Sequence, residues 1–231
     1  MMRLAWALVG LVAFSGGVDA KRRPPAPKLA PPPTAAPAPA AAPDNIWHLS
    51  LSNGGEVVVL LRPDKAPQHV ARVKQLTRAG FYDGTVFHRV IEGFMAQGGD
   101  PQGTGEGGSP LPNLKAEFND LPHLRGAVSM ARAESNDSAN SQFFIMFQPL
   151  FRIDGKYTVF GRVRSGMDTV DTIARGEPPA TPTRISKAWI EADGPNAARV
   201  PLPVTAPGLV PSTPAPATPA PTPIPAGTQQ Q

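Results

Sequence analysis

The clearest alternation of apolar and polar positions runs over residues 46–61. Trp47, Leu49 and Leu51 alternate with the residues between them, and the apolar run EVVVLL follows the turn sequence NGG at 53–55. A period of two places every second side chain on the same face of a strand, and an Asn-Gly pair between two such runs favours a tight turn. The pattern therefore predicts a β-hairpin.

The period changes in the segment that follows, PDKAPQHVARVKQLTRAG. Val70, Val73 and Leu76 recur at the spacing of one face of an α-helix. Pro67 suits the first turn of that helix, and Gly80 suits its end. We therefore predict a helix that begins near Pro67 and ends before Gly80.

The next part of the chain contains short apolar runs separated by turn residues. We expect a short helix at 167–174 and strands at 85–91, 95–98, 126–130, 142–147, within IDGKYTVFGRV, and at 185–190. Many short strands with two helices favour an antiparallel sheet closed into a barrel, because a parallel doubly wound sheet needs helices between its strands. The predicted fold class is mainly β.

Composition divides the 231 residues into four parts. Residues 1–20 have the pattern of a signal peptide, and 44–193 are long enough for one compact domain with a core. Residues 21–43 and 194–231 contain 20 of the 30 prolines. They carry too little bulky apolar surface to offset the entropy of ordering, so we expect a disordered linker and a disordered tail.

The first twenty residues predict export. Arg3 precedes an apolar run over 4–14, and Val18 and Ala20 suit cleavage after Ala20. This run is shorter than the roughly 20 residues that a membrane-spanning helix needs. However, the positive residues at 21–23 oppose export of the chain, so an uncleaved membrane anchor is the alternative.

The net charge of +4 does not belong to the predicted domain. Residues 44–193 carry 16 lysines and arginines against 17 aspartates and glutamates, and the basic excess lies at Lys21, Arg22, Arg23 and Lys28. A nucleic-acid-binding domain needs a basic face, so we expect no nucleic-acid partner. The absence of cysteine excludes disulfides, zinc thiolates and cysteine nucleophiles.

Several patterns that often mark enzymes lack their necessary context. GTGEGG at 103–108 has the spacing of a dinucleotide-binding motif, but Pro110 and Pro112 follow where the phosphate-binding helix must begin. We interpret it as a flexible loop. The four histidines have no metal-ligand spacing, and no serine stands in G-x-S-x-G. We therefore expect neither a metal nor another cofactor.

The stretch FHRVIEGFMAQGGD, at 87–100, places polar groups among apolar ones. Arg89 and Gln97 lie close to Phe94 and Met95 in a segment that should form packed strands. An arginine on an arbitrary strand usually faces water while its apolar neighbours fill the core, and that interpretation requires no function. The alternative is an apolar binding surface that uses both polar groups.

Three strings distinguish these interpretations. FYDGTVFHRVIEGFMAQGGD, MARAESNDSANSQFFI and IDGKYTVFG resemble the cyclophilins, a family of peptidyl-prolyl cis-trans isomerases, in both order and spacing. The resemblance covers residues 46–192, the whole predicted domain. It implies a closed eight-stranded antiparallel barrel with a helix at each end, and an enzyme that accelerates rotation about X-Pro peptide bonds.

The resemblance also implies roles for individual residues. Arg89 matches the catalytic arginine of the family. Phe94, Met95 and Phe144 match the wall of the pocket that takes the proline ring, and Gln97 and Gln142 match the groups that hold the substrate backbone. Ala131 and Arg132 lie where the family presents its backbone to the peptide, and Ile153 and Tyr157 lie at the far rim of the pocket.

Three positions depart from the pattern of many family members. Arg132 stands where many eukaryotic members have asparagine, Arg152 where they have tryptophan, and Tyr157 where histidine is frequent. The tryptophan helps to bind cyclosporin in those relatives, so the resemblance does not extend to strong cyclosporin binding. We assign Phe87, Phe118, Phe143 and Phe160 to the barrel core. We assign Asp100 and Glu117 to turns and the surface.

These residue types suit the implied reaction. Rotation about an X-Pro bond moves no proton and breaks no bond, and its barrier of about 18–20 kcal/mol comes from conjugation of the nitrogen lone pair with the carbonyl. Twisting localises that lone pair, and Arg89 is a donor that stays protonated. An apolar surrounding strengthens the resulting hydrogen bond. The reaction therefore requires no nucleophile, metal or general base.

We expect an exported, periplasmic monomer whose substrates are proline-containing polypeptides and which assists the folding of exported proteins. The alternative function is a proline-peptide-binding scaffold or chaperone, tethered by its proline-rich arms, whose turnover is incidental. A comparison of Arg89→Ala with deletion of the arms distinguishes the two functions.

Overall fold

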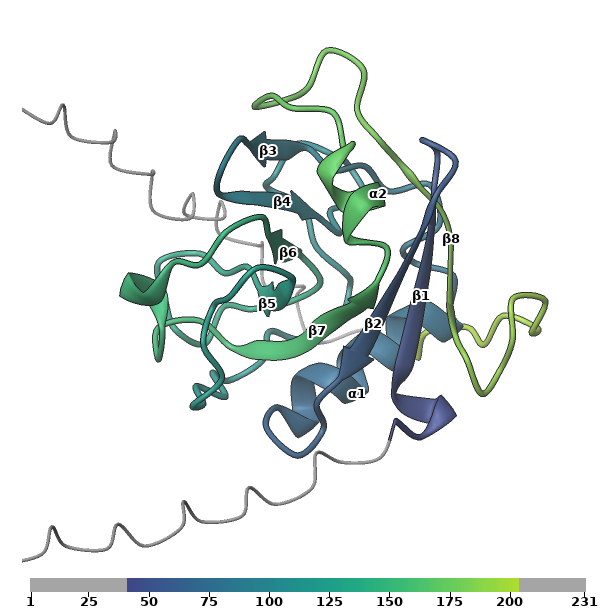
Figure 1. Cartoon of the computed structure of the whole chain (residues 1–231). Helices are drawn as coiled ribbons and strands as arrows, with labels where there is room; N and C mark the ends of the chain where they lie inside the picture. The colour runs from purple at the N-terminus through teal and green to yellow at the C-terminus, as the bar shows by residue number, and fades with distance from the viewer. Residues whose placement is uncertain (1–40, 204–231) are drawn as a thin grey trace, which may run out of the picture. The chain divides into compact units, whose positions relative to one another are not determined.

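The structure is a computed structural model that describes residues 41–203. In this part of the chain there are eight strands, two α-helices and two 3-10 helices (Figure 1). The 3-10 helices span Pro43–Asn45 and Phe151–Ile153. The other elements are β1 (Ile46–Leu51), β2 (Glu56–Leu61), α1 (Pro67–Arg78), β3 (Arg89–Ile91), β4 (Met95–Gly98), β5 (Ala127–Met130), β6 (Phe143–Met146), β7 (Val159–Ser165), α2 (Met167–Asp171) and β8 (Ile185–Ile190).

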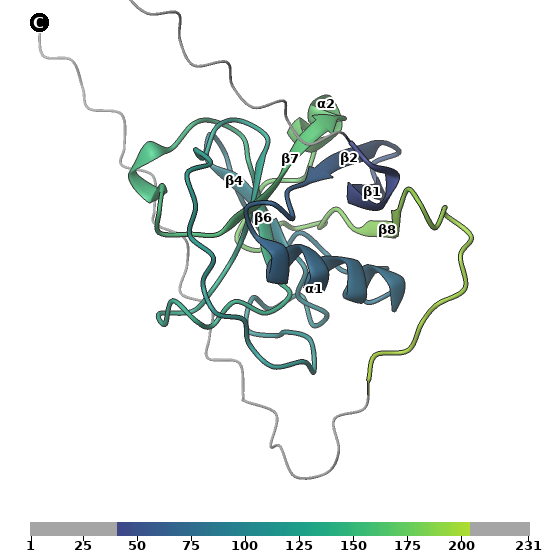
Figure 2. The same ribbon diagram turned by 90° about the horizontal axis from the view of Figure 1, so that it is seen from below.

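All eight strands belong to one antiparallel sheet in the order β3-β4-β6-β5-β7-β2-β1-β8. The sheet curls around its core, and α1 lies across one end of the curl while α2 lies toward the other end (Figures 1 and 2). Two helices at the two ends agree with the prediction, and the mainly β class is confirmed.

The predicted closure into a barrel is wrong. Strands β3 and β8 stand at the two ends of the order and do not pair with each other as strands. Isolated bridges cross this gap instead, between Val86 and Arg184 and between Val90 and Gly176. The segment that approaches β8 contains three prolines, at 178, 179 and 182, and proline has no N–H to donate to a continuous ladder.

The local predictions hold best where the sequence pattern is longest. The hairpin at 46–61, the first helix and the last strand are confirmed. The strand predicted at 85–91 begins only at Arg89, because the residues before it bond elsewhere. Phe87 N–H donates to the Thr183 carbonyl at 2.9 Å, across the gap between the two edges of the sheet.

Both faces of the central strands are buried. All residues of β4, β5 and β6 are buried, and alternate residues enter two different clusters. One set joins the interior core inside the curl: Ala96, Val128, Met130, Phe143 and Ile145. The other set joins a second cluster on the opposite face, which we call the outer cluster: Phe94, Met95, Ala127, Ala131, Phe144, Met146, Ile153, Tyr157 and Val159. Burial on both faces explains why β6, with the sequence FFIM, is a continuous apolar run.

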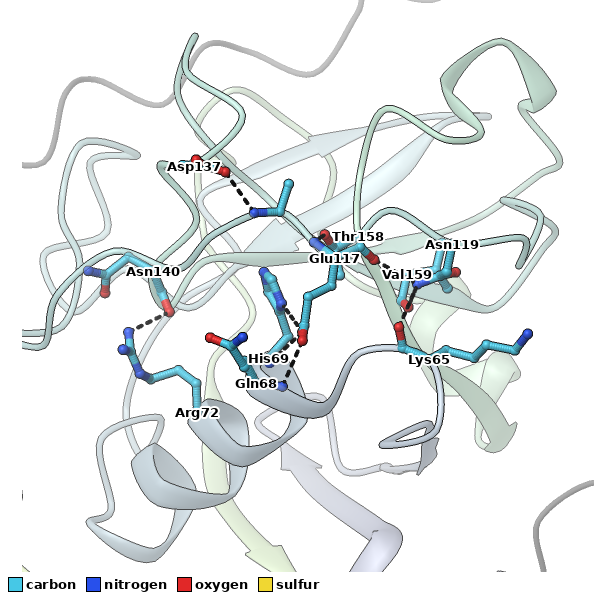
Figure 3. A network of polar contacts seen from close by, with 11 residues as sticks. Lys65, Gln68, His69, Arg72, Glu117, Asn119, Asp137, Asn140, Thr158 and Val159 are labelled. Atoms are coloured by element: carbon cyan, nitrogen blue, oxygen red, sulfur yellow. Dashed lines mark hydrogen bonds and ion pairs between the residues drawn. The ribbon is translucent and has the colours of Figure 1, made fainter.

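A carboxylate from a distant loop caps helix α1 (Figure 3). Ala66 at the helix start provides no side-chain cap. Glu117 accepts the N–H groups of Gln68 and His69 at 3.0 Å each, and its carboxylate lies 2.6 Å from His69 Nδ1. These contacts satisfy N–H groups that have no partner within a helix, and they place a negative charge at the positive end of the helix dipole.

Two predictions for residues of this loop, Glu117 at the surface and Phe118 in the core, are wrong. Glu117 was expected at the surface, but its side chain is only 13 % exposed because it reaches inward to α1. Phe118 was expected in the core, but it points away from the interior and is 40 % exposed. The other three phenylalanines of the predicted core, at 87, 143 and 160, are fully buried as predicted.

The loop also fixes the beginning of β7. Glu117 N–H donates to Thr158 Oγ1 at 3.0 Å, and the Asn119 amide donates to the Val159 carbonyl at 2.9 Å (Figure 3). Thr158 and Val159 directly follow Tyr157, one of the predicted site residues. The N-terminal end of α1 and one side of the predicted site are therefore held by the same hydrogen-bond network.

The described chain continues past the predicted domain boundary at residue 193. Val200 N–H donates to the Arg78 carbonyl at 2.9 Å, and Arg199 Nη1 donates to the Thr77 carbonyl at 3.1 Å. Carbonyls at the end of a helix have no partner within it, so these contacts satisfy the C-terminal end of α1.

We expect Glu117→Ala to lower the free energy of unfolding by about 2 kcal/mol, because it removes the acceptor of two helix N–H groups and of a buried imidazole. Urea unfolding measures the difference. Asp120→Ala is the control, since Asp120 also forms an ion pair at 2.6 Å, with Lys65, but is 75 % exposed. Equal midpoints for the two variants would contradict the capping role.

Candidate active site

A row of side chains crosses four neighbouring strands at one level. Arg89 of β3 pairs with Gln97 of β4, Gln97 pairs with Phe144 of β6, and Phe144 pairs with Ser129 of β5. Opposed residues on antiparallel strands point to the same face and lie side by side. The sheet register therefore brings three of the predicted site residues together on the face that carries the outer cluster.

The outer cluster packs apolar side chains beside this row. Phe94, Met95 and Phe144 are at most 2 % exposed. The ring of Tyr157 meets Phe144 edge to face, with centroids 5.7 Å apart and an interplanar angle of 83°. This geometry is favoured by the quadrupoles of the two rings. Ile153 and Ala131 belong to the same cluster, so six of the predicted site residues pack together.

Two glutamines provide the polar part of the site. Gln142 Nε2 donates to the carbonyls of Gly105 and Gly107 at 2.9 and 2.8 Å. Carbonyl oxygens can only accept, so these contacts set the orientation of the Gln142 amide. Its Oε1 then accepts from Gln97 Nε2 at 2.9 Å.

This arrangement leaves one buried acceptor unsatisfied. Gln97 is 3 % exposed, and its Oε1 has no hydrogen-bond donor among residues 41–203. A buried acceptor without a donor costs free energy.

The carboxylate of Asp100 organises the loop that holds Gln142. Four backbone N–H groups from residues 102–107 donate to it at 2.7 to 3.2 Å. Burial raises the pKa of Asp100, but these hydrogen bonds outweigh it and hold the pKa below its ordinary value. Asp100 was predicted to be a turn and surface residue, yet it is fully buried, because the loop folds around its side chain.

The same loop explains the glycine-rich string at 103–108. Its N–H groups converge on Asp100 of the same chain rather than on a phosphate. A Cβ atom at Gly107 would lie 2.0 Å from Asp100 Oδ1, and Gly105 has a φ of +88°, which favours glycine. The glycines therefore allow a tight wrap around a carboxylate.

Arg132 joins two loops at the edge of the outer cluster. Its guanidinium carbon lies 4.7 Å from the centroid of the Tyr157 ring. Nη1 donates to the carbonyls of Ala133 and Glu134 at 2.9 and 3.0 Å, and Nη2 donates to the Lys156 carbonyl at 3.2 Å. The stacking and the hydrogen bonds hold the Tyr157 side of the site in place.

His123, which the sequence did not identify, supports Phe144 from behind. Its ring stacks on Phe144 with centroids 6.1 Å apart and an interplanar angle of 14°. Nδ1 lies 2.8 Å from Asp154 Oδ1, and Nε2 lies 3.1 Å from Ser129 Oγ. Burial lowers the pKa of His123 even though the hydrogen bond to Asp154 acts in the opposite direction.

The set Ser129, His123 and Asp154 has the order of contacts of a hydrolase triad. However, Ser129 and His123 are completely buried, so a substrate carbonyl cannot reach the hydroxyl. The set therefore acts as packing behind Phe144. His123 has no distinctive sequence context, so its contact with Phe144 was not predictable from local patterns.

Arg89 is held at the edge of the sheet. Its side chain is 13 % exposed, and Nε donates to Glu177 Oε2 at 2.6 Å. The protein thus presents a fixed cationic donor next to an amide pair and an apolar cluster. Among residues 41–203, no group of three or more histidines, aspartates and glutamates is placed to hold a metal ion.

The curled antiparallel sheet places a cationic side chain beside a pair of amides and an apolar cluster. Comparison with known families supports a family assignment. The family described as "Cyclophilin type peptidyl-prolyl cis-trans isomerase/CLD" matches residues 47–190.

Curated relatives agree with this match. The chain is 50 % identical over 155 residues to a "Probable peptidyl-prolyl cis-trans isomerase" of Brucella suis, covering 60 % of this chain and 79 % of the relative. It is 44 % identical over 129 residues to "Peptidyl-prolyl cis-trans isomerase B" of Bacillus subtilis, covering 55 % of this chain and 89 % of the relative.

Solved structures show the same fold. A cyclophilin from Hirschia baltica superposes with a TM-score of 0.61 at 30 % identity and covers 66 % of this chain and 76 % of its own. A cyclophilin-type isomerase of Cryptosporidium parvum, crystallised in the presence of the dipeptide Ala-Pro, gives a TM-score of 0.59 at 29 % identity, with 63 % of this chain and 98 % of that chain covered.

The chain therefore belongs to the cyclophilin-type peptidyl-prolyl cis-trans isomerases, and its activity is the isomerisation of peptide bonds that precede proline.

We expect Asp100→Asn to lower the free energy of unfolding by about 2 kcal/mol at pH 7, because an amide nitrogen would then face backbone N–H groups. The folded-state pKa of Asp100 is depressed, so its contribution is complete above the unfolded value of about 4 and is lost as the pH falls through the folded value. Urea unfolding from pH 7 to pH 3 should show the two proteins converge on acidification.

Asp137→Asn is the control for this measurement. Asp137 also accepts a backbone N–H, that of Ala116 at 2.9 Å, but Asp137 is exposed. A pH-independent difference between Asp100→Asn and the unsubstituted protein would contradict the role of the Asp100 carboxylate.

Proposed function

We propose that Arg89 is the catalytic residue of the isomerase and that it acts as a hydrogen-bond donor to the twisted proline nitrogen. The planar amide has its lone pair delocalised into the carbonyl, whereas the twisted amide has it localised on nitrogen. A donor aimed at that nitrogen binds the transition state more strongly than either ground state, which is the requirement for catalysis. The position of Arg89 beside Gln97 and the outer cluster supports this role.

The required energy is modest. An acceleration of about 10⁵ corresponds to roughly 7 kcal/mol of preferential binding to the twisted state. One hydrogen bond from a charged donor supplies part of this. A low-dielectric surrounding, provided here by Phe94, Met95 and Phe144, increases its strength. The single observation that carries the proposal is an arginine fixed at the edge of a buried apolar cluster.

We propose that the outer cluster holds the proline ring while the preceding residue rotates. Phe94, Met95 and Phe144 pack together with at most 2 % exposure each, so a proline ring would rest on the outer rim of this cluster rather than between these side chains. The Ala-Pro dipeptide named with the Cryptosporidium parvum structure is a ligand of the same chemical type. Ile153, Tyr157, Ala131 and Arg132 then border the bound peptide on the other side.

Gln97 and Gln142 fit the task of holding the peptide backbone. The unsatisfied Gln97 Oε1 would accept an N–H of the substrate. The glutamines would hold the substrate backbone on one side of the X-Pro bond, and the apolar cluster would hold the proline ring on the other side. Rotation is then directed to the X-Pro bond itself. The substrates are therefore proline-containing polypeptides.

We expect Arg89→Ala to lower kcat/KM for a short Ala-Pro-Phe peptide at least 100-fold, measured as relaxation from cis to trans. The loss should lie in kcat, since the bond to nitrogen forms only in the transition state. Arg164→Ala is the control, because Arg164 is exposed on β7. Full activity of the folded Arg89→Ala enzyme would exclude the proposed mechanism.

We further propose that the enzyme acts on exported polypeptides. The support is the signal-like pattern of residues 1–20, which lie outside the described residues. In residues 41–203, neither helix has the length and apolar character needed to cross a bilayer. Isomerisation at proline is slow enough to limit folding, so such an enzyme would assist newly exported chains.

We expect the protein recovered from a periplasmic extract to begin at Lys21, as mass spectrometry would show. It should also accelerate the proline-limited refolding of a secreted protein, and Arg89→Ala should not. Recovery of the uncleaved chain in the membrane fraction would instead support the anchored alternative.

A further inference from the structure

The segment that follows α2 runs along the edge of β3 that does not pair with β4. Val90 N–H donates to the Gly176 carbonyl at 2.8 Å, and Gly176 N–H donates to the Val90 carbonyl at 2.9 Å. The two residues form an antiparallel bridge. In this register the neighbouring pair is Arg89 with Glu177, so backbone pairing places the two side chains next to each other.

The side chains then form a direct ion pair. Arg89 Nε donates to Glu177 Oε2 at 2.6 Å, and the side chains are 13 % and 52 % exposed, respectively. On its other side Arg89 pairs with Gln97 across β4. The row of side chains across the sheet therefore starts at Glu177 and continues through Arg89 and Gln97 to Phe144.

We propose that Glu177 is a positioning residue that fixes the direction of the Arg89 guanidinium. This inference rests on the proposed catalytic role of Arg89. The guanidinium is planar, so a bond at Nε fixes the plane and the directions of the terminal amino groups. Hydrogen bonds weaken steeply with misalignment. A donor that is aligned in advance therefore favours the twisted amide more than a donor that samples several rotamers.

The competing interpretation is a surface ion pair without a function. Glu177 is about half exposed, and exposed pairs contribute little to stability. The two interpretations differ in what they affect. A structural pair would change thermal stability slightly and leave turnover unchanged, whereas a positioning residue would change kcat and leave stability nearly unchanged.

The test compares three variants by kcat and KM for a cis-enriched Ala-Pro-Phe peptide. We expect Glu177→Ala to lower kcat about tenfold with KM within twofold of the unsubstituted enzyme. Glu177→Gln keeps an acceptor for Nε and should stay within threefold. Glu92→Ala is the matched control and should stay within twofold, because Glu92 forms a comparable ion pair with Arg175 at 2.7 Å but is 76 % exposed.

Thermal unfolding of the same variants provides the second readout, and we expect each melting temperature to stay within about 2 °C of the unsubstituted enzyme. The inference is overturned if Glu177→Ala keeps kcat within twofold, if Glu92→Ala loses as much kcat, or if the loss follows the melting temperature. Arg89→Ala separates the two proposals. If it retains activity, the role of Arg89 itself fails, and if it loses activity while Glu177→Ala does not, the positioning role alone fails.

Discussion

The site depends on the register of four antiparallel strands, β3, β4, β6 and β5. This register sets Arg89 opposite Gln97, and Gln97 opposite Phe144. A shift of one residue in any of these pairings would turn the corresponding side chains to the interior core. Such a shift would place a guanidinium or an amide among Phe143 and Ile145, at a large desolvation cost. The packing of the core therefore also fixes the geometry of the site.

Burial of polar groups imposes a second constraint. Asp100 is inside the protein, so the loop around it must supply N–H groups to its carboxylate. The carbonyls of that loop then point toward Gln142, and their demand for donors orients the Gln142 amide and in turn Gln97. One buried carboxylate thus determines which atom of Gln97 is left without a hydrogen-bond partner among the described residues. The strand places Gln97 on the correct face, and these hydrogen bonds then set the orientation of its amide.

The sequence predicted what local patterns encode. The hairpin, helix α1 and strand β8 followed from period and turn residues, and the resemblance named the residues that the sheet register brings together. Pairings between distant segments were not encoded locally. Three features that the sequence did not predict depend on segments over 45 residues apart in the chain. They are the lack of pairing between β3 and β8, the inward turn of Glu117 and the contact of Glu177 with Arg89. Asp100 had one usable signal, since the glycine-rich string at 103–108, which begins three residues after it, is suited to wrapping its side chain.

The ion pair at Arg89 also fits the chemistry of the acceptor. A carboxylate beside a guanidinium reduces its positive potential, which would be costly if the reaction formed an oxyanion. In X-Pro rotation the acceptor is a neutral nitrogen whose lone pair has a definite direction. The interaction then depends more on the alignment of the donor than on its net charge. For this reaction, an arginine held by Glu177 loses little attraction and gains direction, so a paired cation can serve better than an isolated one.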